Sequence, residues 1–210
     1  MMEYLMAAPV ASAIFAFTIL TSVWAFSSEN LYAQMILHPF SVYRGKRVYT
    51  VVTSGFIHND WMHLFFNMLS YYFFAFQLEV VLGHWQFGLL YFVSLILSDL
   101  PTVYKHKNDE WYHSLGASGA VSAVIFSAIL FNPLAKMMIL PLPFGIPAVL
   151  FGVIYLVYCN YASKYSQDNI NHDAHFFGAI TGLLITIALQ PHIVSYFLQQ
   201  VSGGVQSMMH

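Results

Sequence analysis

Apolar residues fall in long stretches along this chain, and polar residues gather with Pro and Gly in the segments between them. A helix needs roughly 20 apolar residues to cross a bilayer. Six stretches are candidate spans: residues 5–26, 61–82, 85–103, 116–131, 146–161 and 174–190. The fourth and sixth are short, which indicates a locally thinned bilayer or helices shielded by their neighbours. The pattern predicts an all-α, polytopic membrane protein with six transmembrane helices.

The six spans are predicted to form one domain over residues 1–190. Residues 191–210 form a weakly amphipathic tail, which we expect in the cytoplasm or on the membrane surface. The first span differs from a signal peptide because it has no basic segment before it: Glu3 is the only charge before Glu29. We therefore interpret it as a membrane helix that is retained.

The composition agrees with a membrane protein. Only 8% of the residues are charged and 59% are hydrophobic, whereas a soluble domain carries roughly 25% charged residues. So few charges cannot coat a water-facing surface, and a lipid bilayer is the expected surrounding. The net charge of -2 excludes a basic nucleic-acid-binding surface. The single cysteine, Cys159, lies in an apolar run and is expected to be a small buried residue.

Polar residues inside membrane helices are candidates for function because they are costly to bury in lipid. His63 and Asn67 lie four residues apart in the second span, so they share one helix face and both offer hydrogen-bond donors. They could also hold neighbouring helices together by interhelical hydrogen bonds.

The fourth and sixth spans begin with small residues around one polar side chain each. Ser118 lies within Gly116–Ala120 (GASGA), and Gly119, Ala123 and Ser127 follow at four-residue spacing. His175 follows Ala174, which begins a similar stripe with Gly178 and Gly182. Such stripes let two helices pack closely, so Ser118 could be a packing residue and His175 an interfacial histidine.

A metal site at the start of the sixth span is a further possibility. His172, Asp173 and His175 carry ligand groups. Two of the three are predicted to lie in the loop, and no H-E-x-x-H spacing occurs. We expect no metal and no cofactor.

The three polar clusters favour a functional site more strongly together than each does alone. Spans two, four and six run in the same direction, so their polar ends lie at one depth. Packing the small-residue stripes of the fourth and sixth spans together would bring Ser118 and His175 within reach of each other, with His63 and Asn67 nearby. A nucleophile, a base and two hydrogen-bond donors would then lie in one layer.

The motifs resemble those of the rhomboid family of intramembrane serine proteases, and they occur in the family's order. HLFFN (63–67) is similar to the H-x-x-x-N of the second span, GASGA to the G-x-S-G of the fourth, and AHFFGAITG (174–182) to the A-H-x-x-G-x-x-x-G of the sixth. Glu79 and Gly83 resemble a further E-x-x-x-G pattern. The resemblance covers about residues 49–189.

The resemblance implies a rhomboid-like bundle and a role for each motif. Ser118 would be the nucleophile and His175 the general base, in a dyad without an aspartate. His63, Asn67 and the backbone amide of Ser118 would stabilise the oxyanion. The substrates would be transmembrane proteins, cleaved where their helices unwind near the membrane surface.

The sequence departs from the family pattern at two positions. Many rhomboids carry a tyrosine four residues after the serine, stacked on the histidine, and here that position is Ser122. The first loop often carries a Trp-Arg pair, and here Tyr49-Thr50 stands in its place, with Arg47 nearby.

The expected orientation conflicts with the charge pattern. The loops after spans one, three and five hold six of the seven Lys and Arg residues, which by the positive-inside rule favours a cytoplasmic location. The family resemblance implies the opposite: an extracytoplasmic active site and cytoplasmic termini. With so few charges we follow the family. The lack of a targeting presequence favours a bacterial plasma membrane.

Two other function classes remain open. An inactive rhomboid-like protein could bind membrane helices as a chaperone or trafficking factor, although such relatives generally lose the serine or the histidine. A small transporter or channel would be favoured by paired acidic residues in mid-span, but Glu79 and Asp99 fall near span ends. The sequence does not indicate an oligomeric state.

Overall fold

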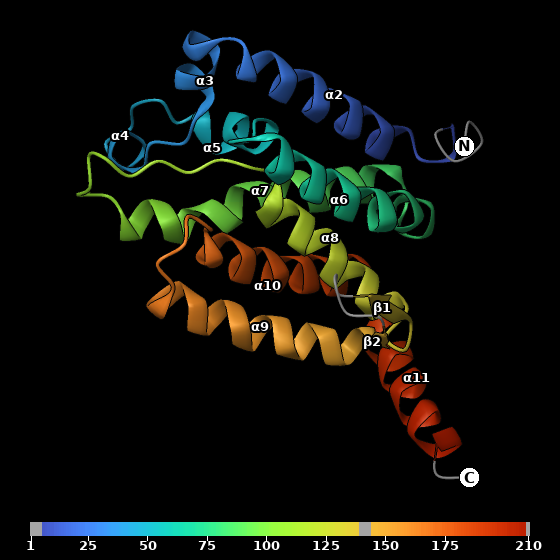
Figure 1. Ribbon diagram of the computed structural model, residues 1–210. Helices are drawn as coiled ribbons and strands as arrows, with labels where there is room; N and C mark the ends of the chain where they lie inside the picture. Colours follow the sequence, from blue (N-terminus) through green and yellow to red (C-terminus); the bar gives the residue numbers. More distant parts are fainter. Residues whose placement is uncertain (1–5, 139–143, 209–210) are drawn as a thin grey trace.

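The computed structural model describes residues 6–138 and 144–208, and nearly all of its regular structure is helical (Figure 1). The long helices are α2 (Pro9–Phe26), α6 (Trp61–Leu82), α7 (His84–Lys105), α8 (Ser118–Phe131), α9 (Ala148–Tyr165), α10 (His172–Leu189) and α11 (Ile193–Met208). Short helices α3 (Glu29–Met35), α4 (Pro39–Tyr43), α5 (Thr50–Thr53) and the 3-10 turn η1 (Ser54–Phe56) lie between α2 and α6. Strands β1 (Lys136–Met138) and β2 (Gly145–Pro147) pair antiparallel before α9.

Each predicted span is a helix, so the prediction of an all-α polytopic bundle is confirmed. The predicted start of the first span, Leu5, lies outside the described residues. The fourth helix starts at Ser118 because Gly116 has φ +114°, which interrupts helical geometry. The prediction that His172 and Asp173 lie in the loop was wrong: α10 begins at His172, because the side chain of Asn171 caps it by accepting from Ala174 N.

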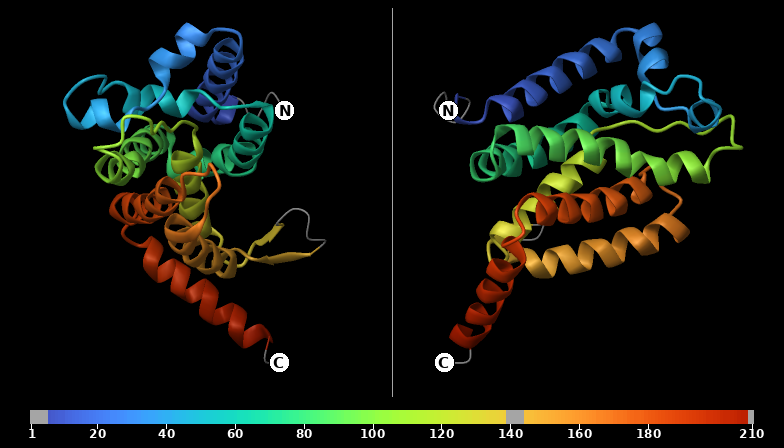
Figure 2. Two further views of the ribbon diagram at one scale, coloured as in Figure 1. Left: turned by 60° about the vertical axis from the view of Figure 1, so that its left-hand side comes forward. Right: turned by 180° about the vertical axis from the view of Figure 1, so that it is seen from behind.

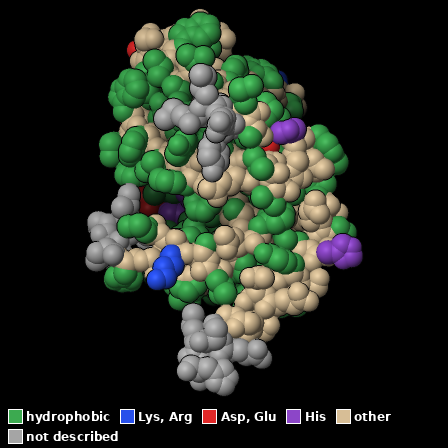
Figure 3. Space-filling model, turned by 90° about the vertical axis from the view of Figure 1, so that its right-hand side faces the viewer, with side chains coloured by type: hydrophobic (Ala, Val, Ile, Leu, Met, Phe, Trp, Pro, Cys, Tyr) green, Lys and Arg blue, Asp and Glu red, His purple; other side chains and the backbone are tan. Residues whose placement is uncertain are grey.

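The surface is that of an integral, multi-pass membrane protein. Among the described residues, α2, α6, α7 and α10 are each long and apolar enough to cross a bilayer. Hydrophobic side chains cover much of the face in Figure 3, with few charged groups among them. Helix α8 has 14 residues, about 21 Å at 1.5 Å per residue, and is shorter than the roughly 30 Å hydrocarbon layer.

Helix α8 is the central element of the bundle. It runs obliquely between the layer of α2, α6 and α7 and the layer of α9 and α10 (Figures 1 and 2). Ten of its fourteen residues are buried. A helix that is apolar all round is expected in such a position, because every face has a protein neighbour.

Glycines allow α8 and α10 to pack backbone against backbone. A Cβ at Gly178 would collide with the carbonyl oxygen of Gly119, and one at Gly182 with the backbone of Ala123. One turn further, Thr186 donates to Ser127 Oγ at 2.6 Å. The two stripes of small residues in the sequence are thus the surfaces through which these helices touch.

Glu79 fastens α2 to the rest of the bundle. Its fully buried carboxylate accepts from Val10 N at 3.1 Å and Ala11 N at 2.6 Å, and His84 Nδ1 lies 2.7 Å away. The first N–H groups of a helix have no intrahelical partner and carry partial positive charge. Glu79 therefore caps α2 from another helix, and Gly83 (φ +100°) makes the turn that brings His84 back to it.

The segment between α2 and α6 is braced by Arg47. Its guanidinium donates to three backbone carbonyls at the end of α3, those of Ala33, Gln34 and Ile36. Arg47 thus joins α3 to the turn before α5, although the Trp-Arg pair of the family pattern is absent.

Candidate active site

Helices α6, α8 and α10 all begin at the same end of the bundle (Figures 1 and 2). His63 lies in the first turn of α6, Ser118 is the first residue of α8, and His175 lies in the first turn of α10. All three side chains are only partly buried, whereas Asn67, one turn further along α6, is 8% exposed. The four polar residues singled out in the sequence therefore occupy one layer.

Ser118 and His175 flank a direct contact between two helix backbones. A Cβ at Gly119 would lie 3.3 Å from the carbonyl oxygen of Ala174. Gly119 follows Ser118 and Ala174 precedes His175, so the close packing of α8 on α10 involves the residues next to the serine and the histidine. Ser118 is also at a helix start, where backbone N–H groups have no intrahelical acceptor.

The loop that leads to Ser118 is held by its neighbours. Gly116 N donates to Ser54 O at 2.9 Å, and Ser114 forms an isolated antiparallel bridge with Leu37. Asn171, the cap of α10, donates through Nδ2 to Ser114 Oγ at 3.0 Å. These bonds tie the start of α8 to the start of α10.

The ring of His63 packs against this loop at Gly116. A Cβ on Gly116 would lie 2.7 Å from His63 Cε1 and 2.9 Å from Nε2, so only glycine fits. Asn67 Nδ2 donates to the carbonyl of His63 at 3.0 Å. An amide NH₂ has two hydrogens, so Asn67 keeps a second donor.

His58 links the loop to α2. Burial lowers the pKa of His58 to about 3, so the ring is neutral near pH 7. Its Nε2 accepts a long hydrogen bond from Ala117 N at 3.5 Å, which leaves the ring hydrogen on Nδ1, 2.9 Å from Ser22 Oγ. His58 lies in the loop before α6, and the buried Ser22 that holds it could not be identified from spacing in the sequence.

Comparison with known proteins gives the family. Residues 45–192 match the model of the rhomboid domain. The chain belongs to the rhomboid family. Over 145 residues, 65% of this chain, it is 32% identical to the protein named "Putative rhomboid protease YdcA" of Bacillus subtilis (strain 168). Over 172 residues, 75% of this chain, it is 23% identical to "RHOMBOID-like protein 12, mitochondrial" of Arabidopsis thaliana. The matches span 64% and 51% of these relatives' own lengths.

A tyrosine from another helix stacks on His175 in this rhomboid. The ring of Tyr155, on α9, lies nearly parallel to the imidazole, with ring centroids 6.3 Å apart and an interplanar angle of 13°. The Tyr155 hydroxyl lies 3.0 Å from Ser122 Oγ. Ser122, which stands where many rhomboids have a tyrosine, thus holds Tyr155 of α9 against His175.

Tyr155 was missed in the sequence analysis. It is 33 residues from Ser122, in a span rich in aromatic residues, and spacing alone does not show which of them faces α8. Its presence could have been inferred from Ser122: because that position carries no aromatic ring, another residue must supply the ring that packs on His175.

Asp173 does not join the two histidines beside it. Its carboxylate pairs with Lys105 at 2.6 Å, where α7 ends. The ligand triplet considered in the sequence, His172, Asp173 and His175, is therefore not brought together around a single point.

A cavity of about 580 Å³ lies away from these residues. It is lined mostly by apolar side chains from the C-terminal parts of α6 and α8 and the start of α11, such as Phe73, Ile129 and Tyr196. None of His63, Asn67, Ser118 or His175 lines it. The cavity is thus separate from the candidate site.

Proposed function

We propose that this rhomboid is an intramembrane serine endopeptidase that cleaves transmembrane-helix substrates near the membrane surface with a Ser118–His175 dyad. The observation that carries the proposal is the close approach of Gly119 to the carbonyl of Ala174, because these residues are the sequence neighbours of Ser118 and His175. The family and the relative named a rhomboid protease support the same chemistry.

In the first half of the reaction, His175 accepts the hydroxyl proton of Ser118 while Oγ bonds to the scissile carbonyl carbon. When the tetrahedral intermediate collapses, the carbon–nitrogen bond breaks and His175 returns the proton to the leaving amine. The products are an acyl-enzyme ester and a new amino terminus. Stacking against Tyr155 keeps the imidazole in one orientation without an aspartate.

The negative charge of the intermediate falls on the former carbonyl oxygen. His63, the free N–H of Asn67 and the backbone amide of Ser118 are the proposed donors to it. Donors of this kind are worth about 2.7–4 kcal/mol each in other proteases. Packing of His63 on the Gly116 loop supports this role, because it fixes one donor relative to the nucleophile.

In the second half, His175 takes a proton from water as the water attacks the ester. The bond from the acyl carbon to Oγ then breaks, His175 returns the proton to Ser118 Oγ, and the carboxylate product leaves. Water must therefore reach a site that lies below the membrane surface. Partial exposure of Ser118 and His175 supports such access. A substrate helix must also unwind locally, because its scissile carbonyl is otherwise bonded within the helix.

The proposed setting is a bacterial plasma membrane, with the active site towards the extracytoplasmic side. Residues 1–190 would be the membrane domain, and 191–210 a tail at the cytoplasmic surface. The protein partners are the transmembrane substrates themselves, and no cofactor takes part.

Cleavage of a model transmembrane substrate by the purified protein in detergent tests the proposal. Ser118→Ala and His175→Ala should each lower turnover at least about a thousandfold, because nucleophile and base act as one unit. Ser127→Ala is the matched control, since Ser127 lies deeper on the same helix and its hydroxyl bonds Thr186 on α10. Undiminished cleavage by either dyad variant would overturn the protease proposal, and no cleavage by wild type would favour an inactive, helix-binding rhomboid.

A further inference from the structure

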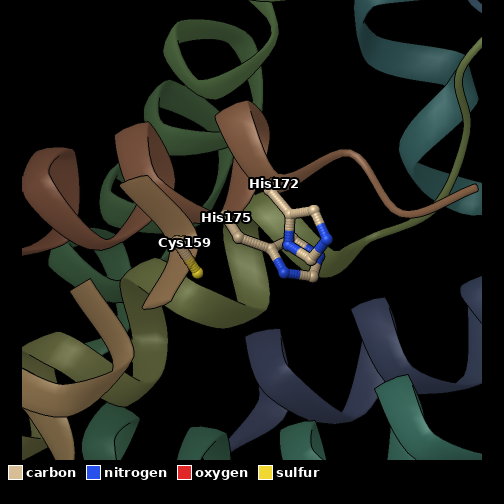
Figure 4. Close-up of side chains that lie close together, drawn as sticks. All are labelled: Cys159, His172 and His175. Carbon is tan, nitrogen blue, oxygen red and sulfur yellow. The ribbon is translucent and has the colours of Figure 1, made fainter. Parts of the chain in front are cut away.

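Three metal-ligating side chains meet at the start of α10. Cys159 comes from α9, and His172 and His175 come from the first turn of α10, with their side chains converging in Figure 4. One ligand atom from each, the sulfur and two imidazole nitrogens, lies within 4.8 Å of the others. Among the described residues no other group of three such side chains is brought together in this way.

His172 brings a buried ring nitrogen, without a partner in the described part of the chain, to this cluster. The side chain is 3% exposed, and its Nε2 lies 3.1 and 3.2 Å from the two carboxylate oxygens of Asp168. A carboxylate accepts, so the ring hydrogen belongs on Nε2 and the lone pair on Nδ1. Nδ1 is buried and has no hydrogen-bond partner among the described residues. A buried acceptor without a donor is costly, and a bound cation would satisfy it.

The carboxylate behind His172 completes an arrangement typical of metal sites. Metal-binding histidines usually donate their other ring N–H to a carboxylate or carbonyl, which fixes the tautomer and makes the ligand more basic. Asp168 does this for His172. It stands at the loop before α10 and does not contribute a ligand atom itself.

The donor set selects a thiophilic cation. One thiolate and two imidazoles suit Zn²⁺, whose three-ligand sites keep a fourth position for water. Tetrahedral Zn²⁺ holds such ligands about 3.3–3.6 Å apart, as its bond lengths imply. The present separations of up to 4.8 Å need to shorten by roughly 1 Å, a change that side-chain rotations can supply. His175 is partly exposed and gives an entry path.

We propose that Cys159, His172 and His175 form a binding site for Zn²⁺ or a similar divalent cation, and that its occupancy inhibits proteolysis. The inhibition rests on the proposed function, whereas the binding site does not. A neutral imidazole has one nitrogen lone pair. Once the metal takes it, the other nitrogen of His175 carries the hydrogen and cannot accept the proton of Ser118. Binding also releases the thiol proton of Cys159 to solvent.

Cobalt spectroscopy on the full-length protein in detergent tests the binding site without reference to activity. Metal-free wild type titrated with Co²⁺ should give a thiolate-to-cobalt charge-transfer band and tetrahedral d–d bands, and Cys159→Ala should give no charge-transfer band. His192→Ala, which removes an exposed histidine outside the cluster, should leave the spectrum unchanged. Absence of the band in wild type, or its persistence in Cys159→Ala, overturns the site.

Zn²⁺ titration of substrate cleavage tests the inhibition. Zn²⁺ should stop wild type, and Cys159→Ala should cleave as wild type does in chelator but resist Zn²⁺. Asp168→Asn should raise the inhibitory Zn²⁺ concentration about 10–100-fold, because the supporting carboxylate is lost. Asp109→Asn, which removes the carboxylate beside His106 in another loop, is its matched control.

The two proposals fail in different ways. Cobalt binding with no effect of Zn²⁺ on cleavage overturns the inhibition alone. A wild type that binds cobalt but never cleaves, even in chelator, overturns the proposed protease function and leaves the metal site standing.

Discussion

At the scale of a residue, the aromatic ring that packs on His175 comes from a different helix than in many rhomboids. Where many rhomboids place a tyrosine on the helix of the serine, this chain places Ser122, and the ring arrives from α9 as Tyr155. The hydroxyl of Ser122 and the phenol of Tyr155 occupy the space between α8 and α9. Ser122 on α8, Tyr155 on α9 and His175 on α10 are therefore linked by side-chain contacts across three helices.

Removal of the ring should impair the chemical step. Tyr155→Leu is expected to lower kcat up to about tenfold with little change in KM, because an aromatic contact is worth about 0.5–1.5 kcal/mol. Tyr155→Phe should restore most of the rate, since it keeps the stacked ring and loses only the hydroxyl, with its bonds to Ser122 and Cys159. The measurement is steady-state cleavage of a model transmembrane substrate in detergent.

Tyr161→Leu is the control for this prediction, because Tyr161 is an exposed aromatic residue on the same helix. An equal loss of kcat in Tyr161→Leu and Tyr155→Leu would contradict a positioning role for Tyr155, as would a loss confined to KM.

Residues could be singled out from the sequence where one side chain is unusual in its surroundings. His63, Asn67, Ser118 and His175 were selected because polar groups are rare in membrane helices, and their catalytic roles stay predictions. Tyr155 and Ser22 could not be selected, because an aromatic residue or a serine is common in such helices. Their importance comes from which helix face meets which neighbour.

At the scale of elements, the small-residue stripes explain how α8 and α10 come together. Long apolar stretches located the spans, but helix ends depended on local features. Gly116 delays the start of α8, and Asn171 starts α10 earlier than hydrophobicity alone indicated. The hydrophobic pattern reveals neither the positive φ of Gly116 nor the cap at Asn171, because each is a property of a single residue.

A methyl group at Gly178 should separate α8 from α10. Gly178→Ala would place Cβ against the carbonyl oxygen of Gly119, and overpacking of this kind typically costs about 1–3 kcal/mol. The expected result is a lower unfolding temperature in detergent together with lost cleavage, because the proposed mechanism needs this helix packing to align Ser118 with His175.

Gly88→Ala is the matched control on α7. A Cβ there would meet only Val10 Cγ1 at an ordinary 3.6 Å, and Ala is favoured over Gly in a helix. Its unfolding temperature should equal or exceed that of wild type. A Gly178→Ala protein as stable and active as Gly88→Ala would contradict the close-packing account.

At the scale of the whole molecule, the charge pattern and the family resemblance predict opposite orientations. Three basic residues near the candidate site make bonds within the protein: Arg47 donates to carbonyls of the α3 segment, Arg44 donates to Lys107 O, and Lys105 pairs with Asp173. Charges engaged in this way need not report which side faces the cytoplasm, because the rule concerns loops read during insertion.

Single-cysteine labelling tests the orientation. In a Cys159→Ala background, Asn108→Cys lies in an exposed loop at the active-site end, and Lys136→Cys lies on the exposed strand β1 at the other end. A membrane-impermeant maleimide added to intact cells should label Asn108→Cys and spare Lys136→Cys. The reverse pattern would place the dyad on the cytoplasmic side.

The most direct test of the central claim is to find which residue a serine-reactive fluorophosphonate modifies. The account predicts one adduct in the wild-type protein, located by peptide mass spectrometry on Ser118. Labelling should disappear in Ser118→Ala, fall sharply in His175→Ala and persist in Ser127→Ala. An adduct on another residue, or undiminished labelling of Ser118→Ala, would contradict the dyad.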